Sequence, residues 1–254
     1  MEHPPYHQLL RLFLDFGEMM LTSGAEIGRV EDSLSRLCRS FGAKSSDVFA
    51  ITSSIVLTVD FGEEAELTGT RRIDRPAGFN FMKIDALNAL CRKCTETEGM
   101  TAETLSVELE RIRRQKPNPL KLYCGSALAA GFFTLFFGGS PLDGIVAALF
   151  GLLICFLQSR LCEYCPNQFF FLFLTCFVSG SGIFLLERFL PFLQEDMIAI
   201  GDIMLVVPGI AITMAARDMI IGDTISGLTR LLESLLWAGA VATGFMLALF
   251  LFGR

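Results

Sequence analysis

The sequence predicts an α-helical membrane protein with about five transmembrane helices, preceded by a soluble cytoplasmic α+β domain. Three observations support this fold class. Charged residues make up only 19% of the chain and hydrophobic residues 52%, whereas soluble domains are roughly 25% charged. Residues 1–121 hold 34 of the 48 charges, and 17 of the 24 phenylalanines follow residue 121. Five apolar stretches in the second half approach the ~17–25 residues that a bilayer-spanning helix needs.

The first two elements of the soluble domain are predicted to be amphipathic helices. Residues 8–21 place apolar side chains at helical spacing, and a break follows at Gly24. Ser23 and Glu26 have the spacing of a capping box, which predicts that a second helix begins there and ends near Gly42. The expected buried faces are Leu9, Phe13, Phe16 and Met20 in the first helix, and Ile27, Val30, Leu34, Leu37 and Phe41 in the second.

The rest of the soluble domain combines strands and helices. Residues 47–73 are rich in β-branched side chains, with a turn signal at Phe61-Gly62-Glu63, and predict two or three antiparallel strands. Helical spacing returns at 79–98, with Ile84, Leu87, Cys91 and Cys94 in phase, and at 102–114, with Leu105, Leu109 and Ile112 in phase. Pro117-Asn118-Pro119 marks the end of the domain, which we place at 1–117.

The transmembrane domain is expected to cover 118–254. The third apolar stretch contains no charge and is the clearest span, whereas Asp143 shortens the uncharged length of the second. The predicted spans are 121–138, 142–159, 168–187, 197–216 and 232–252.

Orientation follows from the lysines and arginines near the ends of the spans. No apolar run with a cleavage site opens the chain, so the N-terminal domain is expected to stay in the cytoplasm. With the N-terminus inside, eight Lys/Arg residues flank the cytoplasmic ends of the spans and two flank the outer ends. The sequence therefore predicts a multi-pass protein of the cell membrane, with its N-terminus inside and its C-terminus outside.

Several function classes are disfavoured. The formal net charge of −6 gives no basic excess for nucleic acid. No Walker motif, His-rich metal motif or nucleophile elbow is present, so we expect neither an enzyme nor a bound cofactor. The pairs Cys91/Cys94 and Cys162/Cys165 have zinc-ligand spacing. Cys91 and Cys94 also fit an apolar helix face, and we predict no metal site.

A break in the fourth span is the main functional signal. Pro208-Gly209 lies in mid-span, where proline removes a backbone donor and forces a kink or an unwound turn. Transporters build substrate sites at such breaks, although a purely structural kink is the alternative. Asp202, about one turn inside the outer end, is a candidate for proton or substrate handling, unless it reaches the headgroups. Thr213 and Asp143 complete the candidate pathway.

The exit loop of the fourth span holds paired opposite charges next to the membrane. These charges could form a cytoplasmic gate, or they could be a solvated loop with weak local ion pairs. The candidate gate residues are Arg217, Asp218, Gly222, Asp223, Arg230 and Glu233.

Four segments together resemble the ThrE-type threonine/serine exporter family, in its N-terminal, YjjP-like half. They are S-G-A-E-I-G-R-V-E (23–31), R-R-I (71–73), N-F-M-K-I-D-A-L-N (80–88) and the specific segment from V-P-G-I-A-I-T-M-A-A-R-D to L-L-E-S-L (207–235). The resemblance implies export of small polar metabolites such as threonine and serine, and in some members of dicarboxylates such as succinate.

The resemblance also implies a partner. Longer members of the family resemble this chain fused to a smaller membrane module of four or five spans, so we expect that module to be a separate subunit. In one place the chain departs from the family. Relatives usually have L-T-N-A after the Pro-Gly, whereas Ile212-Thr213-Met214-Ala215 lacks the amide side chain, which puts the identity of the substrate in doubt.

Two hypotheses follow. The leading one is a subunit of a secondary-active exporter of small amino or carboxylic acids, driven by an ion gradient because no nucleotide-binding motif is present. The alternative is a membrane-anchored cytoplasmic enzyme or ligand-sensing regulator. The candidate ligand or gating residues of the soluble domain are Gly24, Glu26, Arg29, Glu31, Arg72 and Lys83, which could equally be a helix cap and surface charges.

Overall fold

The computed structural model describes residues 6–62, 66–73, 78–96, 99–161 and 167–253. Contacts divide the chain into two compact units. The first, here called the N-terminal unit, comprises Met1–Lys116 and Met214–Arg230, and the second, the membrane unit, comprises Pro117–Thr213 and Leu231–Arg254. Each unit has its own cluster of buried apolar side chains.

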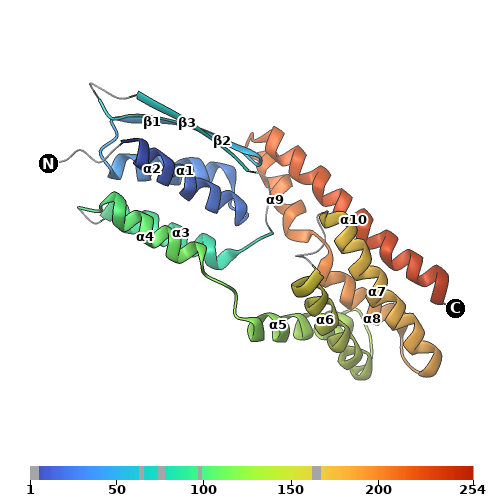
Figure 1. Ribbon diagram of the computed structural model, residues 1–254. Coiled ribbons are helices and arrows are strands. Elements are labelled where there is room, and N and C mark those ends of the chain that lie inside the picture. Colours follow the sequence, from blue (N-terminus) through green and yellow to red (C-terminus); the bar gives the residue numbers. More distant parts are fainter. Residues whose placement is uncertain (1–5, 63–65, 74–77, 97–98, 162–166, 254) are drawn as a thin grey trace. The chain divides into compact units, whose positions relative to one another are not determined.

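The N-terminal unit is an α+β structure in three layers (Figure 1). An antiparallel sheet with the strand order β1-β2-β3 packs against α1 and α2, which in turn pack against α3 and α4. This arrangement confirms the strands and helices that the sequence predicts before residue 117. The elements are α1 (Tyr6–Thr22), α2 (Ile27–Ser40), β1 (Ser45–Ile51), β2 (Ser54–Asp60), β3 (Glu66–Arg72), α3 (Phe81–Glu96) and α4 (Ala102–Arg113).

The core of this unit lies along the apolar faces of its four helices. The predicted face of α1 is fully buried, and so is that of α2 apart from Phe41, which is half-buried just after the helix. On the central strand, Ile55, Leu57 and Val59 alternate with half-buried residues, so one face of the sheet covers the helices. Water-driven burial of large apolar side chains therefore holds this unit together.

The predicted capping box is wrong. Helix α2 begins at Ile27, and its N-cap is Glu26, whose side chain caps no backbone N–H. Gly24 adopts φ +84°, which favours glycine, so the chain turns sharply there and has not yet entered the helix at Ser23. The carboxylate of Glu26 is consequently free to pair with side chains elsewhere.

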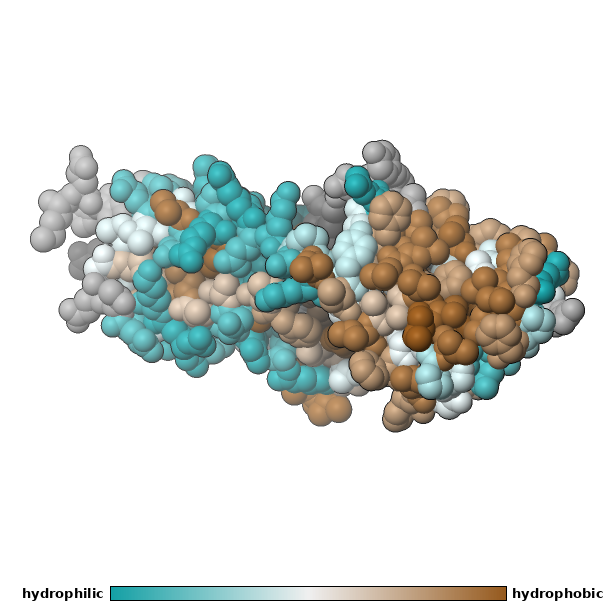
Figure 2. Space-filling model, turned by 90° about the horizontal axis from the view of Figure 1, so that it is seen from below, coloured by the Kyte–Doolittle hydropathy of each residue, from teal (hydrophilic) through white to brown (hydrophobic). Residues whose placement is uncertain are grey.

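The described secondary structure elements of the membrane unit and of the segments continuous with it are all helices. The helices are α5 (Pro119–Phe136), α6 (Pro141–Leu161), α7 (Gln168–Phe189), α8 (Glu195–Val206), α9 (Gly209–Ile220) and α10 (Thr224–Phe252). Four of these helices are long and apolar enough to cross a membrane, and α8 with α9 forms a bent pair that brings the number to five if the pair is one broken span. Figure 2 shows apolar side chains gathered over the surface of these helices and polar ones over the N-terminal unit.

The exit of the fourth span differs from the prediction. Residues 217–230 form the end of α9, a short turn and the start of α10, rather than a loop. Gly222, with φ +104°, supplies the left-handed residue of the turn, so both helices extend beyond the predicted ends of their spans. The charged side chains of this segment consequently project from two helix ends.

Small residues let the membrane helices approach closely. A side chain at Gly151 on α6 would lie 2.8 Å from Ala130 Cβ and 2.9 Å from the Ser126 carbonyl oxygen on α5. One at Gly244 on α10 would lie 2.6 Å from the Phe173 carbonyl oxygen on α7. Two small-residue seams of the sequence, at 126–130 and 240–244, are thus used for packing within this chain.

Candidate functional site

The fourth span breaks at the proline. Val207 has an extended conformation (φ −63°, ψ 130°), as expected before proline, and the axes of α8 and α9 differ by 49°. Pro208 has no N–H, and the Gly209 N–H donates to the Val207 carbonyl at 2.8 Å. The carbonyl groups of Met204 and Leu205 therefore lack their usual helical donors.

The break exposes helix ends of opposite polarity. Helix α8 ends in carbonyl groups, whereas α9 begins with the N–H groups of Ile210 and Ala211, since the Gly209 N–H already donates to the Val207 carbonyl. These N–H groups have no acceptor one turn back within α9, and they add to the positive end of its dipole. A molecule at the break would thus meet acceptors on one side and donors on the other, as an amino-acid zwitterion requires.

Asp202 lies on α8 against the middle of α7. It is the eighth residue of α8, which begins at Glu195, and it is fully buried. Its Oδ2 accepts a hydrogen bond of 3.2 Å from the Ser179 hydroxyl, and its Oδ1 has no donor among the described residues. Ser179 is the twelfth of the 22 residues of α7. The carboxyl group therefore lies opposite the middle of helix α7.

The hydroxyl groups around Asp202 were missed by the sequence reasoning. Thr175 and Ser179 are four residues apart and therefore share one face of α7, and both are fully buried. The Thr175 hydroxyl has no partner among the described residues. The spacing T-x-x-x-S in a charge-free span was the available signal. With Asp202, these hydroxyls place polar groups inside an otherwise apolar unit.

Two predicted pathway residues have local roles. The Asp143 carboxylate accepts from the Ser140 N–H at 2.8 Å and from the Gln194 N–H at 3.0 Å, so it caps α6 and ties down the chain before α8. The Thr213 hydroxyl donates to the Gly209 carbonyl at 3.0 Å within α9. Both oxygens of Asp143 are engaged, which favours a structural role.

The candidate gate residues form two ion pairs within the N-terminal unit. Arg217 on α9 pairs with Glu26, which also lies 3.8 Å from the Arg29 guanidinium. Asp218 is fully buried and lies 3.7 Å from the Arg230 guanidinium of α10. Helix α9 is thus linked on one side to α2 and on the other to α10.

The remaining gate residues occupy the turn and the next helix. The Asp223 N–H donates to the Asp218 carbonyl at 2.9 Å, which closes the turn around Gly222. Glu233 lies on α10 one turn after Arg230 and belongs to the membrane unit.

Glu31 connects α2 to the sheet. Its carboxylate accepts from the Ala50 N–H at 2.9 Å. Burial raises the pKa of Glu31, the hydrogen bond from Ala50 opposes this shift, and the negative charges of Asp223 and Asp47 add to it. Glu31 thus lies within the electrostatic influence of the α9–α10 turn.

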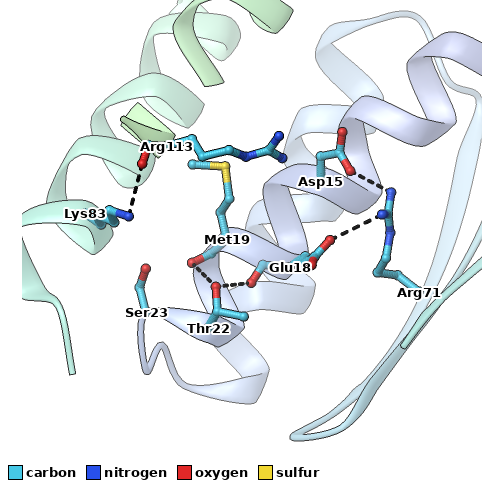
Figure 3. Close-up of a pocket in the computed structure, with 8 residues that line it drawn as sticks. All are labelled: Asp15, Glu18, Met19, Thr22, Ser23, Arg71, Lys83 and Arg113. Atoms are coloured by element: carbon cyan, nitrogen blue, oxygen red, sulfur yellow. Dashed lines mark hydrogen bonds and ion pairs between the residues drawn. The ribbon is translucent and has the colours of Figure 1, made fainter. Parts of the chain in front are cut away.

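A polar pocket lies among α1, β3, α3 and α4 of the N-terminal unit (Figure 3). Of the predicted ligand residues only Lys83 lines it. On β3, Arg71 lines the pocket, whereas Arg72 was the predicted residue. Successive residues of a strand face opposite sides of a sheet, so only one of these two arginines faces the pocket. The lining residues are Asp15, Glu18, Met19, Thr22, Ser23, Arg71, Lys83 and Arg113.

The described cysteines are buried, except for Cys124, which is exposed. Cys91 and Cys94 are buried on α3, and burial raises the pKa of the Cys94 thiol to about 11. Such a thiol stays protonated at neutral pH. Cys162 and Cys165 lie outside the described residues, and no cluster of three or more potential metal ligands occurs among the described ones.

Comparison with known proteins gives one match. No curated protein and no solved structure matches the chain. The model of the family ThrE, described as "Putative threonine/serine exporter", matches residues 11–252, which is nearly the full chain. That family consists of membrane exporters of the threonine/serine type, in agreement with the apolar helices and the broken span. This chain therefore belongs to the ThrE threonine/serine exporter family.

Proposed function

We propose that this chain forms the substrate pathway of a secondary-active exporter of threonine, serine or similar small metabolites, with the substrate site at the break between α8 and α9. The observation that supports this proposal most directly is the unwound Val207–Pro208 turn, with the buried Asp202 carboxyl group in the preceding helix. An interrupted backbone in a membrane span is tolerated where protein or a polar cavity satisfies the freed groups.

Amino acids fit this break better than dicarboxylates do. The Met204 and Leu205 carbonyls can accept from an ammonium group, while the N–H groups that open α9 can donate to a carboxylate. A dicarboxylate such as succinate would engage only the second set. We therefore place threonine and serine before succinate as substrates.

Asp202 is proposed to couple export to a proton gradient. Without a nucleotide-binding motif, an ion gradient is the available source of energy. Asp202 lies six residues before Pro208, roughly 9 Å along a helix, and its Oδ1 has no donor among the described residues. A carboxyl group there can take up a proton from outside and release it inward as substrate leaves.

The ion pairs Glu26–Arg217 and Asp218–Arg230 are proposed as the cytoplasmic gate. Both involve neighbouring residues at the end of α9, the second half of the broken span. A rotation of α9 would therefore change both pairs together. Compared with the gate residues expected from the sequence, the proposed gate adds Glu26 and omits Glu233.

The membrane orientation is part of the proposal. We place residues 1–117 in the cytoplasm and the C-terminus outside, from the eight-to-two distribution of lysine and arginine. A reporter that is active only in the cytoplasm should work when fused at residue 115 and fail after Arg254. The reverse pattern would overturn the orientation.

A separate membrane subunit is proposed to complete the exporter. This expectation rests on the resemblance to longer, fused family members. The seams at 126–130 and 240–244 are already occupied within the chain, so the partner would use other surfaces. Threonine flux through the purified chain, reconstituted alone, would refute the need for a partner.

The coupling role can be tested with Asp202→Asn. Threonine efflux would be measured, with and without a protonophore, from preloaded cells that lack their own exporters and that produce this chain together with the small membrane subunit. We expect wild-type efflux to fall when the proton gradient collapses and Asp202→Asn efflux to respond much less, with little change in half-saturating threonine. Asp196→Asn, an exposed carboxylate on the same helix, is the matched control. If Asp202→Asn keeps full sensitivity to the protonophore, Asp202 does not carry the proton.

A further inference from the structure

The polar pocket of the N-terminal unit is large enough for a small metabolite. Its volume is about 390 Å³, within the range of roughly 300–1,000 Å³ for small-molecule sites. All eight lining residues lie between positions 15 and 113, so the pocket belongs to one compact unit. It is separate from the break in the fourth span and from both gate ion pairs.

One wall of the pocket is acidic. Asp15 and Glu18 lie on α1, and Arg71 of β3 binds both, at 2.6 Å and 3.3 Å (Figure 3). Two carboxylates share one guanidinium, so one negative charge is not neutralised there. The Thr22 hydroxyl donates its proton to the Glu18 carbonyl at 2.7 Å. The lone pairs of the Thr22 hydroxyl oxygen therefore remain as hydrogen-bond acceptors on this wall. This wall suits an ammonium group.

The opposite wall is basic. Lys83 of α3 donates to the backbone carbonyl of Arg113 at 3.3 Å, and no carboxylate pairs with its ammonium group among the described residues. The Arg113 guanidinium, which also pairs with Glu110 at 3.5 Å, extends toward the pocket in Figure 3, and the Ser23 hydroxyl points into the same space. A carboxylate could accept hydrogen bonds from these three side chains.

We propose that this pocket binds an α-amino acid, with its ammonium group at Asp15, Glu18 and Thr22 and its carboxylate at Lys83, Arg113 and Ser23. The two walls match the two charges of a zwitterion. A dicarboxylate would place a second negative charge against Asp15 and Glu18 and would be disfavoured. The assignment of the ligand as the exported metabolite rests on the proposed function.

The position of the pocket makes it a sensor of cytoplasmic substrate. Ser23 opens the turn that contains Gly24 and leads to Glu26, the residue that pairs with Arg217 of the gate. The Ser23 carbonyl also accepts from the Asn80 N–H at 3.0 Å, which fastens the turn to the residue before α3. An amino acid held at Ser23 thus lies three residues from the gate ion pair and can stabilise one position of this turn.

The test is amino-acid binding by the full chain in detergent, measured by titration calorimetry and by thermal shift. The probes are L-threonine and succinate. We expect L-threonine to bind with measurable heat, and succinate to bind at least about tenfold more weakly because it lacks the ammonium group. Lys83→Gln and Asp15→Asn should each weaken L-threonine binding at least about tenfold, whereas Lys83→Arg, which keeps the charge, should retain most of it.

Two controls make the result specific. Lys93→Gln lies on the same helix but pairs with Glu108 away from the pocket, and it should bind L-threonine like the wild type. Asp202→Asn, in the proposed transport pathway, should also retain this binding. The unliganded melting temperature of each variant shows whether it is folded, and Asp15→Asn serves as the weakened variant if Lys83→Gln does not fold.

The outcomes separate this proposal from the proposed function. Binding of L-threonine that survives both Lys83→Gln and Asp15→Asn, equal affinity for succinate, or no binding at all would overturn the pocket assignment, even if cells still export threonine. Binding in the pocket without any threonine export, by cells that produce this chain together with the small membrane subunit, would instead refute the proposed export of threonine and leave an amino-acid-binding domain.

Discussion

Both units of this protein have a buried apolar cluster, but the side chains on their outer surfaces differ. The interior of the N-terminal unit is made of large apolar residues such as Phe13, Phe16 and Leu34, and its surface holds most of the charges. In the membrane unit the side chains of Thr175, Ser179 and Asp202 are fully buried, while the outside is lined with phenylalanine, leucine and isoleucine.

This difference reflects two solvents. Water drives the apolar side chains of the N-terminal unit together, but lipid gives no comparable force between membrane helices. The membrane helices are held instead by close contacts between small residues, and their buried polar groups serve another purpose. A buried Asp202 is costly in lipid, so its presence points to function.

The largest expected effect is a difference in stability between substitutions of a buried and of an exposed phenylalanine. Phe13 is fully buried in the N-terminal unit, whereas Phe250 on α10 is 84% exposed. Phe13→Ala should destabilise the N-terminal unit by about 3–5 kcal/mol, and Phe250→Ala should change neither unit measurably. Hydrogen–deuterium exchange of the full chain in detergent would show the loss of protection within residues 6–113. Equal effects of the two substitutions would contradict the conclusion that the N-terminal unit is folded in water and the membrane unit in lipid.

An intermediate effect is expected from adding volume between membrane helices. A side chain at Gly201 on α8 would lie 2.7 Å from the Ala130 carbonyl oxygen and would also strike Thr134 on α5. Gly201→Leu should therefore destabilise the membrane unit by at least about 1–3 kcal/mol. Gly125→Leu, where a side chain meets open space, is the control. Thermal unfolding in detergent would measure both, and an unchanged midpoint for Gly201→Leu would mean that α5 and α8 are not in close contact.

The smallest effect concerns the pH dependence of the N-terminal unit. Because burial raises the pKa of Glu31 in the folded state, its ionisation costs stability at neutral pH. Below the pKa that Glu31 has in the unfolded chain, its contribution to stability is fully present. This contribution is lost as the pH rises through the pKa that Glu31 has in the folded protein. Glu31→Gln keeps an acceptor for the Ala50 N–H and should stabilise the unit at pH 7 but not at pH 4. A stabilisation that is equal at both pH values would contradict this cause.

Much of the fold follows from periodicity in the sequence. Helical spacing of apolar residues predicted α1 to α4, and β-branched residues predicted the sheet, because burial in water imposes those patterns. The capping box predicted at Ser23 and Glu26 was wrong because Gly24, with φ +84°, makes a turn and the helix begins only after it. The spacing between Ser23 and Glu26 does not reveal this turn. The ends of α9 and α10 were missed because helices can continue past the membrane.

The candidate site was predicted only in part. Pro208 signals a break through its missing N–H alone, so the sequence was sufficient. The depth of Asp202 was not predictable, because it depends on which residue of α7 packs opposite it. The polar pocket was also hidden, since Asp15, Arg71 and Arg113 come from three separate elements. Arg72 was chosen over Arg71 because the sequence does not state which face of an exposed strand is covered.

The most direct test of the proposed pathway restores a continuous fourth span. Pro208→Ala with Gly209→Leu returns a backbone donor and a helix-favouring side chain, and a side chain at Gly209 meets open space. The matched control is Pro141→Ala with Gly125→Leu, since Pro141 opens α6 and Gly125 lies in an unbroken helix. Threonine efflux would be measured from cells that also produce the small membrane subunit, with the two double variants inserted in equal amounts. We expect efflux to be abolished by the first pair and retained with the second. Normal efflux from Pro208→Ala with Gly209→Leu would show that the break is only a kink and that the substrate passes elsewhere.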